Sequence, residues 1–191
     1  MTSEITIRPA THDDIPALEP LIARSARVLS AGDYTAEQIE GALGDAFGVD
    51  TQLVRDRTYF VVEVDGEMAG CGGWSFRRTL FGADGRPDRE PERLDPATEA
   101  AKIRAFFVDP PFARRGLGKM LLEYCEAEAR AAGFTRAELM STLPGLRLYS
   151  RYGYAGSERI DYPLSSGVSI PFVPMIKSLV GHSEEASAEE G

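Results

Sequence analysis

Apolar and polar residues alternate along the chain in a pattern that predicts a mixed succession of strands and helices. Thr11 with Asp14 and Thr35 with Gln38 have the spacing of capping boxes, and each pair precedes apolar residues at helical spacing. We expect Val28 and Leu29 to lie on the apolar face of the first helix, and Phe47 on that of the second. Strands are predicted at 5–7, 59–64, 68–74, 101–108, 136–140, 154–162 and 168–177, and two further helices at 118–132 and 144–152. The resulting order, β-α-α-β-β-β-α-β-α-β-β, predicts one mixed α/β domain.

Turn signals add detail between these elements. Asp65-Gly66 separates two apolar runs and predicts a tight β-hairpin. Glycines 70, 72 and 73 lie inside a predicted strand, where glycine indicates a bulge or a closely approaching backbone. Trp74 follows them and is either a wall of an acceptor pocket or a core residue. Residues 77–99 contain glycines, prolines and many charges, which predicts a long loop with a role as a substrate lid or as a mobile surface insertion.

Composition narrows the class of protein. The chain has 191 residues, of which 43% are hydrophobic and 27% charged, as in one ordinary globular domain. No apolar run is long enough to span a membrane and no secretory signal is visible, so we expect a cytoplasmic protein without membrane partners. The net charge is −9, and four of the acids lie in the tail at 180–191, which we expect to be disordered. A chain with this negative net charge is unsuited to binding the negatively charged backbone of a nucleic acid. Cys71 and Cys125 lie in apolar runs without metal-ligand spacing, so no metal is predicted.

A glycine-containing loop follows the strand at 101–108. Gly116 and Gly118 lie between that strand and the next predicted helix, where backbone amides at a helix N-terminus bind anions. The loop also carries three basic residues, Arg114, Arg115 and Lys119, so a diphosphate is the predicted ligand. The dinucleotide fingerprint fails at Leu121, and a Walker loop fails because Met120 follows Lys119. A surface helix that merely begins with glycines is the plain alternative.

In this loop the sequence resembles the GNAT superfamily of acyl-CoA-dependent N-acyltransferases. The family pattern is Q/R-x-x-G-x-G/A, which Gly116 and Gly118 match, while Ala113 stands at its leading position. The resemblance implies that backbone amides hold the pyrophosphate of coenzyme A, with charge from Arg114 and Arg115. It also implies that pantetheine pairs with the backbone of the preceding strand.

A second block carries the same resemblance. The family reads N-x-x-A-x-x-L/F-Y-x-x-x-G-F/Y, which Leu148, Tyr149, Gly153 and Tyr154 match in register. Thr142 and Gly145 replace the usual Asn and Ala. An amine that attacks a thioester expels a thiolate, which a nearby hydroxyl can protonate. The resemblance therefore implies that Tyr149 is the general acid; a core aromatic is the alternative reading.

The resemblance extends over residues 4–178 and implies an α/β fold with a mostly antiparallel sheet of six to seven strands and about four helices. It implies transfer of an acetyl group from acetyl-CoA to a primary amine, of a small molecule or a protein, by direct attack. The amide of Phe106 would stabilise the oxyanion. The implied cofactor contacts are Phe106, Phe107, Val108, Arg114, Arg115, Gly116, Leu117, Gly118, Lys119, Thr142 and Tyr149. A homodimer is implied by analogy alone.

The general base is the weak point of this mechanism. Some family members have a glutamate where this chain has Lys102, and a lysine is a base only with a strongly depressed pKa. Glu63 and Glu99 are possible substitutes, and a water chain is another, so no base is assigned. Lys102 and Thr142 also motivate a rival function, a non-catalytic acyl-CoA-binding or sensing module. A nucleotide-phosphate-binding protein is a third class, disfavoured by the two failed fingerprints.

Overall fold

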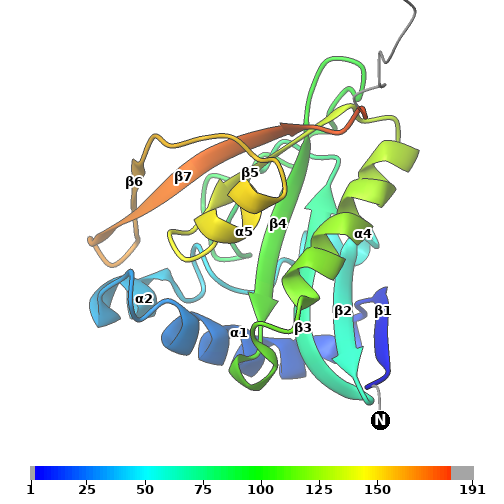
Figure 1. Cartoon of the computed structure of the whole chain (residues 1–191). Helices are drawn as coiled ribbons and strands as arrows, with labels where there is room; N and C mark the ends of the chain where they lie inside the picture. The colour runs from blue at the N-terminus through cyan, green and yellow to red at the C-terminus, as the bar shows by residue number, and fades with distance from the viewer. Residues whose placement is uncertain (1–2, 182–191) are drawn as a thin grey trace, which may run out of the picture.

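The computed structural model describes residues 3–181, which form a seven-stranded sheet in the order β1-β2-β3-β4-β5-β7-β6 (Figure 1). The strands are β1 (Ile5–Pro9), β2 (Tyr59–Val64), β3 (Glu67–Ser75), β4 (Ala101–Val108), β5 (Arg136–Ser141), β6 (Ile160–Pro163) and β7 (Ser169–Ser178). The helices are α1 (Ile15–Leu29), α2 (Ala36–Ala42), α3 (Thr51–Arg55), α4 (Leu117–Ala131) and α5 (Leu146–Arg151). All neighbouring strands are antiparallel except β4 and β5. The predicted mixed, mostly antiparallel fold is thus confirmed.

Several local predictions need correction. Phe47 does not lie on α2, because Leu43 leaves the helical conformation and Gly44 turns the chain at φ +84°. Val28 and Leu29 are exposed rather than buried. The strand predicted at 154–162 is reduced to β6, and the short helix α3 was not predicted. The tail expected to be disordered lies, from residue 182 on, outside the described residues.

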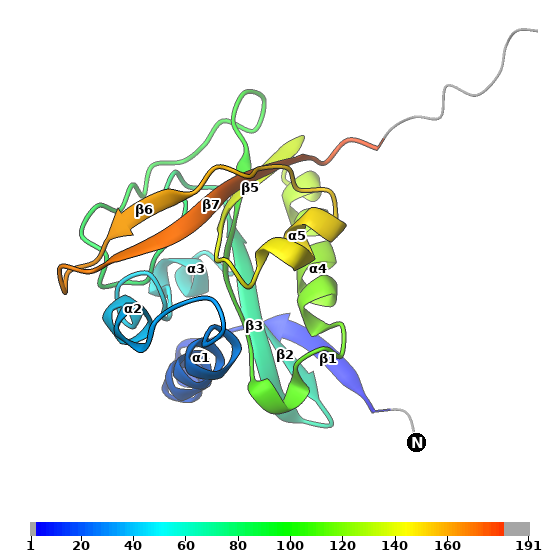
Figure 2. The ribbon, with the colours of Figure 1, turned by 60° about the vertical axis from the view of Figure 1, so that its left-hand side comes forward.

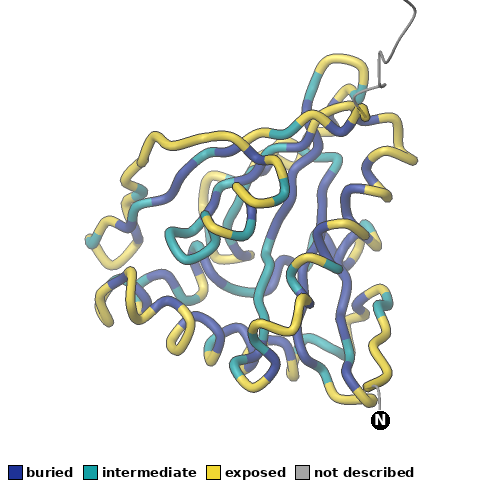
Figure 3. Tube along the Cα trace, viewed as in Figure 1, coloured by how far each residue is buried: buried dark blue, intermediate teal, exposed yellow. Residues whose placement is uncertain are grey.

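Two layers of helices cover the sheet, one on each face (Figure 2). On one face α1 and α3 bury Leu18, Leu21 and Leu53 against β2 and β3. On the other face α4 buries Leu121 and Cys125 in the largest apolar cluster. A third cluster joins α2 to β6 and β7. The central strands β2, β3 and β4 are consequently mostly buried, whereas the edge strands β1 and β6 are largely exposed (Figure 3).

The sheet divides between β4 and β5. These two strands pair only at Ala101 with Ala137 and at Lys102 with Glu138, whereas β4 pairs with β3 as far as Val108. Figure 1 shows the two strands diverging beyond this point, with α5 beside the opening. The β5-facing backbone edge of β4 therefore has no strand partner after Lys102. An unpaired edge of this kind offers hydrogen-bonding groups to an extended ligand.

Candidate active site

The glycine loop between β4 and α4 presents a row of free backbone donors. Within the described residues, none of the amides from Arg114 to Lys119 donates a hydrogen bond, and the first bond of α4 runs from Met120 N to Gly116 O at 3.1 Å. No side chain caps the helix at Gly116. Unsatisfied amides at a helix N-terminus attract anions through their partial positive charge. The loop thus has the donors that the sequence predicted for a diphosphate.

Backbone conformation explains the residues of this loop. Gly116 has φ +82°, and a Cβ at this position would meet nothing within 4 Å, so glycine is needed for conformation rather than for space. Arg114 also has a positive φ, of 63°. At Gly118 the requirement is space, because a Cβ would lie 3.2 Å from Leu148 of α5. The side chains of Arg114, Arg115 and Lys119 are exposed beside the amides.

A bulge in β4 determines to which face of the sheet the residues after it point. Ala105 has φ 54°, and the register between β3 and β4 shifts opposite this point. A Cβ on Gly72 would lie 2.5 Å from the ring of Phe106, so the predicted close approach at the glycines of β3 is confirmed. Glycine at this position leaves the space that the aromatic ring of Phe106 occupies. Phe107 follows on the opposite face of the sheet, in contact with the α1 and α2 clusters.

A cavity of about 70 Å³, the central cavity, lies where β4 and β5 separate. Its walls include Phe106 and Tyr149, whose ring centroids are 6.4 Å apart. Tyr149 is 9% exposed and its hydroxyl makes no hydrogen bond to another described residue. Burial raises the pKa of the Tyr149 phenol above its ordinary value, so the proton is retained at neutral pH. The two residues predicted to serve the reaction are therefore brought together.

Thr142 also lines the central cavity, at the position where the family usually has Asn. Its hydroxyl accepts a hydrogen bond from Gly145 N at 3.2 Å, across the turn that leads into α5. A Cβ on Gly145 would meet Tyr149 at 3.1 Å and Thr142 at 3.0 Å. These contacts fix the turn that carries Tyr149 towards the cavity.

The described part of the chain places no carboxylate in the wall of the central cavity. Lys102 is 7% exposed and ion-pairs with Glu138 across the last β4–β5 pair, and burial lowers its pKa. Glu99 pairs with Arg78, and Glu63 pairs with Arg8 beside β1. Neither glutamate reaches the cavity, so neither fits the role of a general base acting directly on an amine there.

The loop at 77–99 is held against the sheet rather than extended into solvent. Arg77 pairs with Asp56 at 2.6 Å, and Thr79 and Glu90 exchange hydrogen bonds. Its residues Phe81 and Gly82 line the central cavity. Ala83, Asp84 and Gly85 line a second, outer cavity of about 330 Å³ on the α1 side. The predicted long loop therefore forms a wall of both cavities.

The outer cavity and the central cavity share one wall residue, Phe47. Trp74, by contrast, lies in the core between Phe76 and Phe134, at centroid distances of 5.9 and 6.0 Å. The core alternative for this tryptophan is the correct one.

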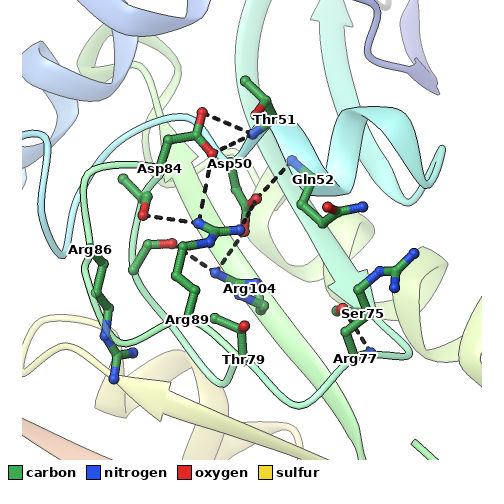
Figure 4. A network of polar contacts seen from close by, with 12 residues as sticks. Asp50, Thr51, Gln52, Ser75, Arg77, Thr79, Asp84, Arg86, Arg89 and Arg104 are labelled. Atoms are coloured by element: carbon green, nitrogen blue, oxygen red, sulfur yellow. Dashed lines mark hydrogen bonds and ion pairs between the residues drawn. The ribbon is translucent and has the colours of Figure 1, made fainter. Parts of the chain in front are cut away.

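Sequence reasoning missed a buried charge network beside the central cavity (Figure 4). Asp50 is completely buried and receives two guanidinium groups, from Arg89 at 2.8 Å and from Arg104 of β4 at 2.6 Å. It also caps α3 through Gln52 N at 3.0 Å. The one available signal was Arg104, a second basic residue after Lys102 inside a mainly apolar strand. Its partners come from distant segments that only the fold brings together.

These features define a class of protein: a splayed sheet, a loop of free amides beside the splay, and a phenol in the cleft, as in acyl-CoA-dependent acyltransferases. The model of the GNAT acetyltransferase family matches residues 29–154, which is more than half of the chain. The chain belongs to this family, and this membership indicates an acyl-CoA-dependent acetyltransferase. A search of curated proteins finds no match.

Solved structures with the same fold have low sequence identity. A GCN5-related N-acetyltransferase from Rhodopseudomonas palustris matches with a TM-score of 0.69 and 18% identity, over 93% of this chain and 98% of that one. The acetyltransferase yncA from Salmonella typhimurium, solved with acetyl-CoA, matches with a TM-score of 0.63 and 19% identity, over 97% and 100%. PaiA N-acetyltransferase from Thermoplasma acidophilum, solved with coenzyme A, has a TM-score of 0.59 and 15% identity, over 92% and 99%.

The described residues contain neither a membrane-spanning helix nor a cluster of metal-binding side chains. No helix between residues 3 and 181 has both the length and the apolar character needed to cross a membrane. No group of three or more His, Cys, Asp or Glu side chains in the same range is placed to hold a metal ion.

Proposed function

We propose that the protein transfers the acetyl group of acetyl-CoA to a primary amine by direct attack, with Tyr149 as general acid. The observation that carries this proposal is the juxtaposition of Tyr149 and Phe106 in one cavity, at the opening between β4 and β5. The free amides of Arg114 to Lys119 lie at the start of the adjacent helix. A thioester carrier whose diphosphate binds these amides directs its sulfur towards that opening.

Each step has a candidate group on this chain. The unpaired edge of β4 at Phe106, Phe107 and Val108 would pair with pantetheine, and the amide of Phe106 would donate to the oxyanion. The nitrogen of the amine forms a bond to the carbonyl carbon while the carbon–sulfur bond breaks. The phenol of Tyr149, protonated because burial raises its pKa, gives its proton to the thiolate that leaves.

The proton of the ammonium substrate leaves through water in this scheme. No carboxylate is needed in the wall of the central cavity if the amine enters as its neutral form or passes its proton to solvent. The outer cavity adjoins the central one at Phe47 on the α1 side and has two carboxylates, Glu19 and Asp84, in its wall.

The test compares two tyrosine variants. Incubation with acetyl-CoA and a panel of amines should release free thiol above background, and Tyr149→Phe should lower kcat by about 100-fold, the ordinary worth of general acid catalysis. Tyr124→Phe is the matched control, because Tyr124 lies on α4, packs on Phe60 at 4.8 Å and is 37% exposed, away from the cavity. Equal activity of the two variants would remove Tyr149 from the mechanism.

The non-catalytic sensing module remains the second candidate, on one observation: Lys102 occupies the glutamate position and is engaged with Glu138. Binding of acetyl-CoA without thiol release on any amine would favour it over the enzyme.

A further inference from the structure

Arg104 of β4 lies two residues before Phe106 and lines the central cavity. The residue is 4% exposed, and of the described residues in the cavity wall it alone is charged. A guanidinium group is an unusual wall residue, because the transfer of an unpaired charge from water into an apolar site is costly. Its presence beside the reacting groups calls for a chemical reason.

The partners of Arg104 leave part of its guanidinium group unused. Its Nη2 donates to the carbonyl of Gly82 at 2.7 Å and lies 2.6 Å from Asp50 Oδ2. Its Nε is buried and has no hydrogen-bond partner among the described residues, and its contact with Asp50 Oδ2 is an ion pair without a hydrogen bond. Buried donors are nearly always paired in native proteins, so an unpaired one beside a cavity indicates a ligand that accepts from it.

The local charge also has a positive excess. Asp50 is one carboxylate shared by two guanidinium groups, those of Arg104 and Arg89. Burial lowers the pKa of Arg104 to about 10 even though Asp50 acts in the opposite direction. A second acid, Asp84, lies 3.7 Å from Arg89, and its side chain is 45% exposed. An anion in the central cavity would complete the neutralisation.

The rest of the cavity wall is apolar and mainly aromatic. It includes Phe47, Phe81, Phe107 and Phe172, of which Phe81 and Phe172 have centroids 5.4 Å apart. Its volume of about 70 Å³ equals the space of about five waters. This volume suits the amino and carboxylate ends of a small molecule, and the aromatic wall suits an apolar side chain.

We propose that the acetyl acceptor is an amine that also carries a carboxylate, namely a free amino acid with an apolar side chain, and that Arg104 binds this carboxylate. The inference rests on the proposed acetyl transfer to a primary amine. Arg104, Phe106 and Tyr149 line the same small cavity, so a molecule that carries both an amine and a carboxylate could contact all three. The guanidinium fork is suited to a planar carboxylate.

The experiment compares leucine, leucinamide and 3-methylbutylamine, which share a side chain and differ in the carboxylate. The kcat/KM values are compared per concentration of unprotonated amine. A hydrogen bond between charged groups predicts that leucine exceeds the other two by about 10-fold or more. Equal or better use of leucinamide would overturn the inference and leave the acetyltransferase proposal standing.

Two variants test the residue itself. Arg104→Lys keeps a cation beside Asp50 but loses the planar fork, and it should reduce the leucine-to-leucinamide ratio towards one. The ratio is independent of how much enzyme is folded. Arg77→Lys is the control, because Arg77 pairs with Asp56 outside the cavity wall, and it should keep the wild-type ratio. An unchanged ratio in Arg104→Lys would overturn the assignment of Arg104.

A failure of all three amines to release thiol would reject acetyl transfer to this substrate class, and binding then decides the inference. Calorimetry with coenzyme A present should show tighter binding of N-acetylleucine than of N-acetylleucinamide. Equal binding of the two, or binding of neither, would overturn the carboxylate site.

Discussion

At the scale of single residues, two glycines adopt a left-handed backbone conformation, and one of them lies in the loop of free amides. Gly116 and Gly66 have almost the same conformation, with φ +82° and +81°, and a Cβ on either would meet nothing within 4 Å. They differ in place: Gly116 precedes α4 in the loop of free amides, and Gly66 closes the β2–β3 hairpin. A comparison of alanine variants at these two glycines therefore distinguishes the effect of backbone strain from an effect on cofactor binding.

Replacing each of these glycines with alanine should lower the free energy of unfolding by about 1 kcal/mol, the cost of a left-handed conformation for an L-residue. Only Gly116→Ala should also raise the KM for acetyl-CoA, by several-fold, because it shifts the amides that face the diphosphate. Chemical denaturation and steady-state kinetics on both variants provide the check. A KM raised equally by Gly66→Ala would show that strain alone explains the effect.

At the scale of elements, ion pairs join segments that the sequence separates. Arg8 of β1 pairs with Asp14, just before α1, and with Glu63 of β2. Asp14 also accepts from Thr11 N at 2.8 Å, which completes the predicted capping box. These contacts fix the first helix against the edge of the sheet.

Asp14 predicts a dependence of stability on pH. The hydrogen bonds from Arg8 lower the pKa of Asp14 from 3.8 to about 2. A carboxyl with a lowered pKa in the folded state stabilises it above the unfolded pKa, and this contribution is lost as the pH falls from about 4 to about 2. Asp14→Asn should therefore lower the urea midpoint at pH 7, and the difference from wild type should shrink through that window.

The control is Asp13→Asn, since Asp13 is exposed and forms no ion pair within the described chain. Its urea midpoint should follow that of the wild type at every pH. A constant difference between Asp14→Asn and wild type from pH 7 to pH 2 would contradict the assignment.

The helices and strands also show which features can be predicted from local sequence patterns and which cannot. The strand at 101–108 is observed with the predicted bounds, because a largely apolar run with two basic residues is followed by Asp109 and two prolines. The helix α3 was missed because one turn of five residues has no periodicity to detect. Tyr149 and the glycine loop were found from local motifs, whereas Arg104 and Asp50 were not, since their pairing depends on the loop at 77–99 and on the sheet together. Long-range contacts of this kind leave little local pattern.

At the scale of the whole molecule, the two parts of the sheet meet at only two β4–β5 residue pairs among the described residues. The helices α4 and α5 lie side by side on one face of the sheet (Figure 2). A cofactor that binds the loop before α4 and the free edge of β4 would bridge these parts. Since it binds the native state, it should stabilise the molecule as a unit: at about 100 times its Kd, the gain is about 2.7 kcal/mol.

This bridging predicts both a thermal shift and a pattern of protection. Saturating coenzyme A should raise the unfolding temperature by about 5 to 10 °C for a chain of this size. Hydrogen exchange should slow in peptides that cover 104–108 and 114–119. The cofactor would supply acceptors to the amides at 114–119, which have none within the described chain, and would cover the edge of β4 that β5 leaves unpaired. The hairpin at Asp65-Gly66, at the far side of β3, should exchange as before. ATP at the same concentration should raise the unfolding temperature by less, because it has no pantetheine to pair with β4. An equal rise would favour a general nucleotide-phosphate site over a site that binds the whole of coenzyme A.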